Sequence, residues 1–287
     1  MLAIWKREFK SYLHTVIGWL FMAVILFFVG LYFTATNLLY GSAYFSNVIS
    51  ACGFILLLAV PILTMRCLAE ERKNKTDQLI LTAPVSLGKI IAGKFLALAS
   101  IFTIPILVIC LYPLILMKFG NIPVAESYTA ILGFYLYGLA CMAVGVFISS
   151  LTESQVIAAV VSFIVLLLSN MLTSIASMLP TDALSQALIL TVAWIVVCVI
   201  AYNMMKNITV AAILAVIGEV VVWGIYIAKS AVYENLLSKV ADAFAITSRY
   251  SDFELGILKY DAIVYYISVS FLFVFLTVQI IKKKRFN

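Results

Sequence analysis

The stretch from Ser11 to Met65, SYLHTVIGWLFMAVILFFVGLYFTATNLLYGSAYFSNVISACGFILLLAVPILTM, decides the fold class of this chain. It contains no Asp, Glu, Lys or Arg, and His14 stands near its start. A membrane-spanning helix needs about 20 apolar residues, because the hydrocarbon core is about 30 Å thick and a helix rises about 1.5 Å per residue. The stretch is therefore long enough for two membrane spans.

The composition of the whole chain agrees with a membrane protein. Of its 287 residues, 65% are hydrophobic and 11% are charged, whereas soluble domains carry about 25% charged residues. The mean hydropathy is +1.15. We predict an all-α transmembrane bundle that forms one domain over residues 1–287, with eight spans at 15–37, 46–65, 90–117, 127–150, 155–178, 184–205, 208–228 and 261–281.

The distribution of Lys and Arg predicts the orientation of this bundle. If the N-terminus is cytoplasmic, 14 of the 19 basic residues lie on the cytoplasmic side, and Lys118, Lys229, Lys239, Arg249 and Lys259 lie outside. Cytoplasmic loops of membrane proteins are enriched in Lys and Arg. We therefore expect a multi-pass protein of the cell membrane with both termini in the cytoplasm.

Several other functional classes do not fit the sequence. The net charge of +6 lies at the ends of apolar segments and not on an aromatic-studded polar face, which argues against nucleic-acid binding. The apolar run from Val16 to Phe33 exceeds the length of a signal-peptide core, so we expect it to remain as the first span. Five cysteines show neither a C-x-x-C pair nor His at metal-ligand spacing, so we predict buried free thiols and no metal site.

The segment from Gly88 to Lys94 fits the first seven positions of a P-loop, G-x-x-x-x-G-K. The eighth position is Phe95, where the P-loop needs Ser or Thr to hold Mg²⁺. The segment also runs directly into an apolar helix. We therefore expect no nucleotide site here, and we expect Lys94 to extend to the lipid headgroups at the entrance of a span.

Two connections are too long to be simple turns. The first, residues 66–89, is rich in polar groups and is predicted to be cytoplasmic. Pro84 prevents helix through Ala83. Thr76 can cap a short helix before it, and the carboxylate of Asp77 suits the N-terminal dipole of that helix. Ser86 can cap the helix of the next span. The second, residues 229–260, carries Leu and Phe at helical spacing and predicts an extracytoplasmic amphipathic helix or a simple connector.

The first connection carries the order E-E-R-K-x-x-T-D-Q-L-x-L-T-A-P-V-S from Glu70 to Ser86, followed by Gly93-Lys94. This order resembles the coupling segment between the second and third spans of ABC type-2 permeases, in particular the gliding-motility-type branch. The stretch GVFISSLTESQVIAA, residues 145–159, resembles the second cytoplasmic turn of that branch, and WKREF near the N-terminus resembles its interfacial helix, here residues 1–14. The chain departs from many relatives at Lys75, where they carry Gly.

The resemblance implies a function and partners. It implies the membrane-spanning permease of an ABC exporter, without a catalytic, cofactor or metal site of its own. A separate cytoplasmic ATPase would bind ATP and Mg²⁺, and the permease would pair with a second copy or a sister permease within the membrane lipids. The implied ATPase-coupling residues are Glu70, Glu71, Thr76, Asp77, Gln78, Leu79, Pro84 and Ser86.

Glu219 is the acidic residue deepest within an apolar segment. A charge at the centre of a bilayer is costly, so Glu219 is expected to face protein or water or to be protonated. It either belongs to a transport pathway or is a hydrogen-bonded packing residue near Trp223. A proton-coupled secondary transporter and a non-transporting scaffold or immunity protein are the alternative functions.

Small residues at Cys141, Gly145 and Ser149 recur every four positions within the predicted fourth span. This spacing places them on one face of a helix, where small side chains let a neighbouring helix approach closely. We therefore expect this face to contact another helix.

Overall fold

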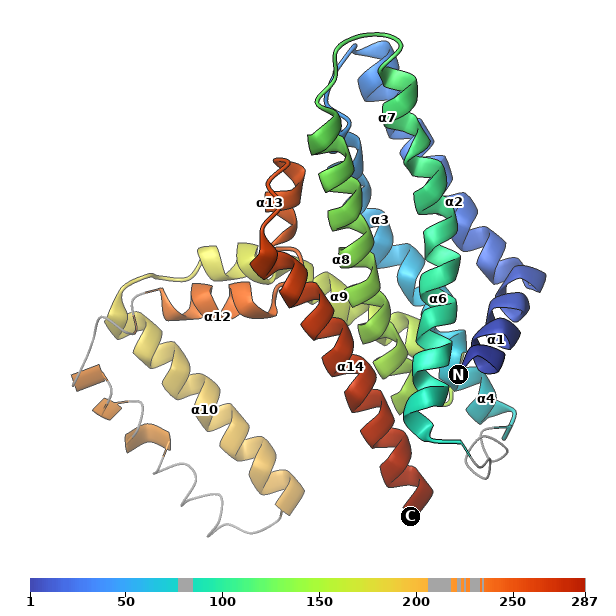
Figure 1. Cartoon of the computed structure of the whole chain (residues 1–287). Helices are drawn as coiled ribbons and strands as arrows, with labels where there is room; N and C mark the ends of the chain where they lie inside the picture. Colours follow the sequence, from blue (N-terminus) through green and yellow to red (C-terminus); the bar gives the residue numbers. More distant parts are fainter. Residues whose placement is uncertain are drawn as a thin grey trace. The chain divides into compact units, whose positions relative to one another are not determined.

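The computed structural model describes residues 1–76, 85–205, 218–220, 223–224, 226–227, 233 and 235–286. The described residues form helices joined by turns, which confirms the predicted all-α fold (Figure 1). The elements are α1 (Leu2–His14), α2 (Val16–Phe33), the π-helix η1 (Thr34–Leu39), α3 (Ser46–Thr64), α4 (Arg66–Lys73), α6 (Leu87–Ile109), α7 (Leu111–Leu116), α8 (Val124–Leu151), α9 (Gln155–Ser177), α10 (Ala183–Met205), α12 (Leu236–Phe244), α13 (Tyr250–Glu254) and α14 (Tyr260–Phe286).

Six helices in the described residues are long and apolar enough to cross a membrane. They correspond to the first five predicted spans and the last one, and their bounds are Val16–Leu39, Ser46–Lys73, Leu87–Leu116, Val124–Leu151, Gln155–Ser177 and Tyr260–Lys283. The predicted span at 184–205 coincides with helix α10, of which Ala183–Val192 is found as a shorter apolar helix. The predicted span at 208–228 lies largely outside the described residues. The predicted count of eight is therefore not confirmed.

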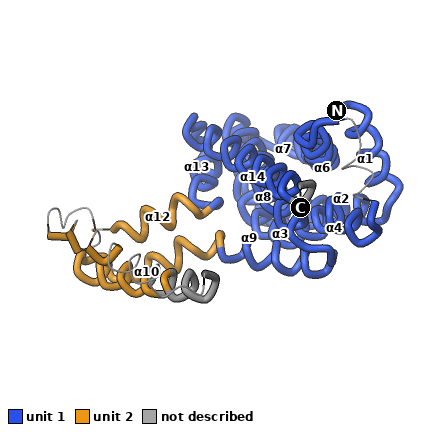
Figure 2. Tube along the Cα trace, turned by 90° about the horizontal axis from the view of Figure 1, so that it is seen from below, with its two compact units in different colours: residues 1–168, 246–287 blue, residues 169–245 orange. Residues whose placement is uncertain are grey.

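The chain divides into two compact units (Figure 2). The first comprises Met1–Leu168 and Ile246–Asn287, and the second comprises Ser169–Ala245. In the first unit, α2 and α6 run antiparallel to α3 and α8 (Figure 1). The N-terminus, α4 and the C-terminal end of α14 lie at one end of this unit, and α7 lies at the other.

Helix α8 is the centre of the first unit and packs against α3, α6, α13 and α14. Glycines make this close packing possible. A Cβ atom on Gly138 would lie 2.3 Å from Cε1 of Phe102 in α6, and one on Gly145 would lie 2.3 Å from Oγ1 of Thr64 in α3. Ser149, one turn further, accepts hydrogen bonds from the backbone N–H groups of Leu68 and Ala69 in α4. The predicted close contact along the small face of this helix is confirmed.

The predicted amphipathic segment at 229–260 contains two separate elements. Helix α12 belongs to the second unit, and it carries the expected apolar positions, of which Val240 and Phe244 are exposed. Helix α13 belongs to the first unit, where Tyr250 and Phe253 are buried. The aromatic rings of α13 pack against Tyr137 of α8 and Tyr266 of α14. The expected location of the segment, at the outer membrane interface, stays a prediction.

Candidate functional site

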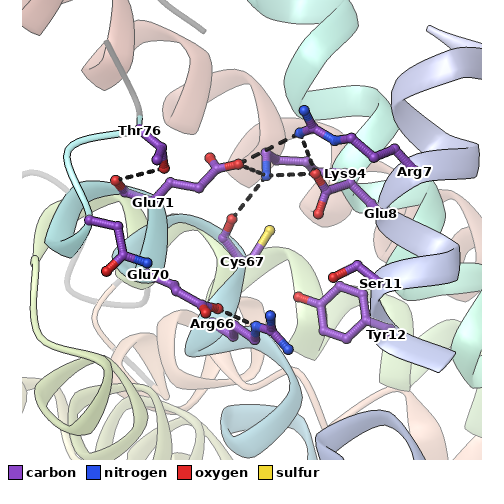
Figure 3. Close-up of a pocket in the computed structure, with 11 residues that line it drawn as sticks. Arg7, Glu8, Ser11, Tyr12, Arg66, Cys67, Glu70, Glu71, Thr76 and Lys94 are labelled. Atoms are coloured by element: carbon purple, nitrogen blue, oxygen red, sulfur yellow. Dashed lines mark hydrogen bonds and ion pairs between the residues drawn. The ribbon is translucent and has the colours of Figure 1, made fainter. Parts of the chain in front are cut away.

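An ion-pair cluster joins three helices at the end of the first unit that holds the N-terminus (Figure 3). Glu8 comes from α1, Glu71 from α4 and Lys94 from α6. The Lys94 Nζ atom lies 2.7 Å from Oε1 of Glu71 and 3.3 Å from Oε1 of Glu8. It also donates to the backbone oxygen of Cys67, at 3.2 Å. All three donors of the ammonium group therefore point at oxygen atoms of the chain.

The charges of this cluster are balanced. Arg7 Nη2 lies 2.6 Å from Oε1 of Glu8 and 3.8 Å from Oε1 of Glu71, so Arg7 covers the two carboxylates from the outside. Two cations thus face two anions. Within α4, Arg66 pairs separately with Glu70 one turn further along the helix. A buried charge is tolerated only when it is paired and hydrogen-bonded, and this arrangement satisfies that condition for Lys94.

The position of Lys94 corrects the prediction from the sequence. Its side chain is only 2% exposed, so the expected extension to the lipid headgroups is wrong. The physical reason is that Gly93 has no side chain: a Cβ atom added there would lie only 3.2 Å from Cγ2 of Ile4 in α1. Helix α1 therefore lies directly on α6 and covers Lys94, while Glu8 supplies a counter-charge. The whole P-loop-like segment from Gly88 to Lys94 is part of helix α6.

A pocket of about 420 Å³ opens beside the cluster. Polar and charged side chains of α1, α4 and α6 form most of its wall (Figure 3). It reaches Asn74 and Thr76, so it adjoins the place where the chain enters residues 77–84. The lining residues are Arg7, Glu8, Ser11, Tyr12, Arg66, Cys67, Glu70, Glu71, Asn74, Thr76 and Lys94.

The structure places four of the eight predicted coupling residues. Glu70 and Glu71 are engaged within the chain, by Arg66 and Lys94 respectively. The Thr76 hydroxyl donates to the backbone oxygen of Glu71 at 3.2 Å, so it closes the turn after α4. Ser86 is the N-cap residue of α6, as predicted, but its side chain forms no capping hydrogen bond. The other four predicted residues, Asp77, Gln78, Leu79 and Pro84, lie outside the described residues, as does the short helix predicted to follow Thr76.

Lys75 precedes this turn in a left-handed backbone conformation, with φ of 55°. Glycine adopts this conformation without strain, whereas a residue with a Cβ atom does so at a cost. Lys75 therefore holds this conformation at a cost that Gly would not incur. The chain nevertheless forms the turn, which two backbone hydrogen bonds close, from Lys75 N–H to Arg72 and from Thr76 N–H to Glu71.

Three participants in the cluster, Arg7, Glu8 and Lys94, were not among the predicted site residues. Lys94 carries the signal that could have revealed them. It stands among apolar residues of the span, and its neighbours at helical spacing, Ile91 and Leu98, are buried. A lysine on the buried face of a helix requires an acidic partner. The identity of that partner depends on which helix crosses α6 at that point.

The cluster joins three helices through ion pairs. Its carboxylates are occupied by cations, and the described part of the chain contains no group of three or more potential metal ligands. The ion pairs hold α1, α4 and α6 in one arrangement.

The charge balance predicts an acid-sensitive step in stability. Burial opposes ionisation of Glu8, but the Lys94 ammonium and the Arg7 guanidinium outweigh it and lower the pKa of Glu8 below its ordinary value of 4.5. A group with a depressed folded-state pKa stabilises the fold above the unfolded-state pKa. We expect this contribution to be constant at neutral pH and to be lost as the pH falls below about 4.5 through the folded-state value.

The measurement is thermal unfolding of the detergent-solubilised protein between pH 7 and pH 3, compared with Glu8→Gln. The variant is expected to be less stable at pH 7, and its stability should fall less steeply over the acid range. Parallel pH profiles for the two proteins would contradict this role of Glu8.

The structure describes Glu219 within a short helical stretch of the second unit. The side chain is partly buried, and its Oε1 atom has no hydrogen-bond partner among the residues that the structure describes. The two roles suggested from the sequence, a pathway residue and a packing residue, both stay predictions. The neighbouring positions 206–217 and 221–222 lie outside them.

These observations define the class of the protein: an α-helical, multi-pass membrane protein with a charged joint at the end where both termini lie. A comparison with protein families matches residues 36–277 to the ABC-2 family transporter proteins. The chain belongs to this family, as its resemblance indicated. It is thus a permease subunit of an ABC transporter, and permeases of this family are membrane subunits that lack an ATPase. A comparison with the curated proteins found no significant match.

Proposed function

We propose that this permease couples ATP hydrolysis in a separate cytoplasmic ATPase to export across the cell membrane. The observation that carries the proposal is the ion-pair cluster of Glu8, Glu71 and Lys94. The 74–86 connection leaves α4 and re-enters the bundle at α6, and the cluster ties both helices to α1. A displacement of this connection would therefore move the second and third spans as well as the N-terminal helix.

The mechanism requires partners that supply what this chain lacks. Two copies of the ATPase would bind ATP and Mg²⁺, and their closure would move the segment from Thr76 to Thr82. A second copy of this chain or a sister permease would form the other half of the translocation pathway. Displacement of the rigid second and third spans would then change access between the paired permeases.

The proposed orientation puts the ion-pair cluster on the cytoplasmic side. The 14-to-5 distribution of Lys and Arg supports this orientation. The common location of the N-terminus, α4 and the C-terminal end of α14 is consistent with it (Figure 1). Asp182 and Arg249 would then lie outside the cell.

The coupling proposal is tested by the double substitution Asp77→Lys and Leu79→Asp. A helix as short as the one predicted after Thr76 is marginal without a partner, so we expect these side chains to dock on the ATPase. The variant should lose ATPase association in a pull-down, or retain association but lose substrate-stimulated hydrolysis. Its abundance in the membrane should stay near that of the wild type.

A matched control is Asp261→Lys with Leu258→Asp, which makes the same chemical changes at two exposed positions near the start of α14. This control should keep both association and coupling. Unchanged association and coupling in the Asp77 and Leu79 variant, at equal abundance, would overturn the proposed coupling role of the segment.

Glu219 is the proposed ionisable group of the pathway. Its place within an apolar segment and its partly buried side chain support this role. We expect Glu219→Gln to fold and insert normally, because Gln keeps the size and removes the cost of a buried charge, and to change the transport rate or its pH dependence. Transport by Glu219→Gln at the wild-type rate across pH 6 to 8 would remove Glu219 from the mechanism.

A further inference from the structure

Helix α1 has one face turned toward the bundle. On this face, Trp5 Nε1 donates to Ser100 Oγ at 2.9 Å, and the Tyr12 hydroxyl donates to the backbone oxygen of Leu63 at 3.5 Å. Glu8 lies between them and pairs with Lys94. The single carboxylate of α1 is therefore turned inward and neutralised.

The opposite face of α1 carries a basic stripe, which we define as Lys6 and Lys10. These two residues are one helical turn apart, both are exposed, and neither forms an ion pair with the residues that the structure describes. Leu2, one turn before Lys6, is 79% exposed. Arg7 differs from both lysines, because its guanidinium group is occupied by Glu8. The outward face thus presents uncompensated positive charge beside an exposed apolar side chain.

The position of α1 brings this stripe to the level of the lipid headgroups. Thr15 alone separates α1 from α2, which begins the first span. Trp19, at the start of that span, is 60% exposed and donates from Nε1 to the backbone oxygen of Leu13 at 2.7 Å. Trp side chains at span ends lie at the membrane–water interface. The lysine stems are long enough to place their ammonium groups among headgroups from a neighbouring turn.

We propose that Lys6 and Lys10 bind the headgroups of anionic phospholipids and so anchor α1 to the cytoplasmic leaflet. The proposal rests on the cytoplasmic placement of α1 in the proposed function. Charge complementarity selects the lipid class: a helix face with two free cations and no free anion attracts an anionic headgroup and gains nothing comparable from a zwitterionic one. The apolar side chains that flank the stripe, Leu2 and Val16, which is 81% exposed, favour a lipid surface over an acidic protein surface.

The anchoring would affect the coupling unit directly. Because Glu8 and Lys94 tie α1 to α6, a lipid bound to Lys6 and Lys10 would hold the ion-pair cluster at a set depth in the membrane. Each lysine near an anionic surface is expected to contribute roughly a fivefold enrichment of anionic lipid. The permease would therefore respond to the lipid composition of the leaflet.

The test reconstitutes the full chain, with Trp194→Phe and Trp223→Phe, into vesicles of phosphatidylcholine with phosphatidylglycerol. Trp5 and Trp19 then report on nearby lipids. Acyl-chain bromination is placed either on the anionic or on the zwitterionic lipid at equal mole fraction. We expect several-fold stronger quenching by the brominated anionic lipid, a difference that 0.5 M salt reduces and that Lys6→Gln with Lys10→Gln abolishes.

The matched control is Lys282→Gln with Lys283→Gln, which removes the same charge from two exposed lysines of α14 and should leave the preference intact. A second measurement is the amount of phosphatidylglycerol that copurifies with the chain without the Trp substitutions. This amount should fall in the Lys6 and Lys10 variant and stay unchanged in the Lys282 and Lys283 variant. Equal quenching by the two lipids in the reporter protein would overturn the proposal. A preference unchanged by the Lys6 and Lys10 substitutions would also overturn it, and if these substitutions weakened ATPase pull-down instead, the stripe would belong to the ATPase interface.

These outcomes are independent of the coupling test. Loss of lipid preference with normal ATPase association would support the lipid site alone. Loss of coupling in the Asp77 and Leu79 variant with an intact lipid preference would support the proposed function alone.

Discussion

Replacing Lys94 with Met is expected to destabilise the protein by about 3–5 kcal/mol, because two acidic side chains would lose their shared buried cation. Met fills a similar volume, so the cost arises from charge and not from a cavity. Glu71 would lose its 2.7 Å contact and Glu8 its 3.3 Å contact. Arg7 is 62% exposed and would remain the sole cation of the cluster. The measurement is the apparent melting temperature of the detergent-solubilised protein.

A compensating variant separates charge pairing from other effects of the substitution. In Lys94→Met with Glu8→Gln and Glu71→Gln, no unpaired buried charge remains, and stability should return most of the way to that of the wild type. The Glu8→Gln and Glu71→Gln double variant, which leaves Lys94 without an anion, should be as unstable as Lys94→Met. If Lys94→Met melted within 1 °C of the wild type, the cluster would have no structural role.

Gly138→Ala is expected to destabilise the bundle by about 1–3 kcal/mol through overpacking. The added Cβ atom would lie 2.3 Å from Cε1 and 2.6 Å from Cζ of Phe102. Phe102 is fully buried and packs against the rings of Phe21 and Phe134, at centroid distances of 6.0 and 5.9 Å. It therefore has no free space into which to move, and the helices α6 and α8 would have to separate.

The matched control is Gly88→Ala, in the first turn of α6. No heavy atom lies within 4 Å of a Cβ atom added there. Ala is a better helix former than Gly by up to about 1 kcal/mol, so this variant should be as stable as the wild type or slightly more stable. Equal melting temperatures for Gly138→Ala and Gly88→Ala would contradict the close approach of α6 and α8.

The spans could be predicted from the sequence because the information needed for them is local. A run such as Val16–Phe33 must become a helix in a bilayer, where each backbone polar group has to find its partner within the segment. The described helices match six of the predicted spans within a few residues at their starts. The second continues beyond the predicted end at 65 to Lys73, since no helix breaker separates Thr64 from Arg66.

The order of residues 70–86 indicated a family resemblance, but it did not show how the acidic side chains of this segment are used. Glu71 looks in the sequence like one more charge of a solvated connection. Its carboxylate instead turns inward to Lys94, because α6 returns beside α4 and brings an ammonium group within 2.7 Å. Similarly, α13 looks like part of a surface connector until Tyr250 and Phe253 are seen against α8 and α14.

The sequence by itself determined that this chain crosses a membrane repeatedly and to which family it is similar, and it predicted an orientation from its charges. Hydropathy, helix length and the positive-inside bias act on each segment separately and need no knowledge of its neighbours. The tertiary structure alone decided that Glu8, Glu71 and Lys94 meet, and that Lys6 and Lys10 form no ion pair among the residues that the structure describes. These facts depend on where α1 crosses α6. The crossing is possible because Gly93 leaves space for α1. It is favoured because the buried ammonium group of Lys94 needs two carboxylates that lie far from it in the sequence.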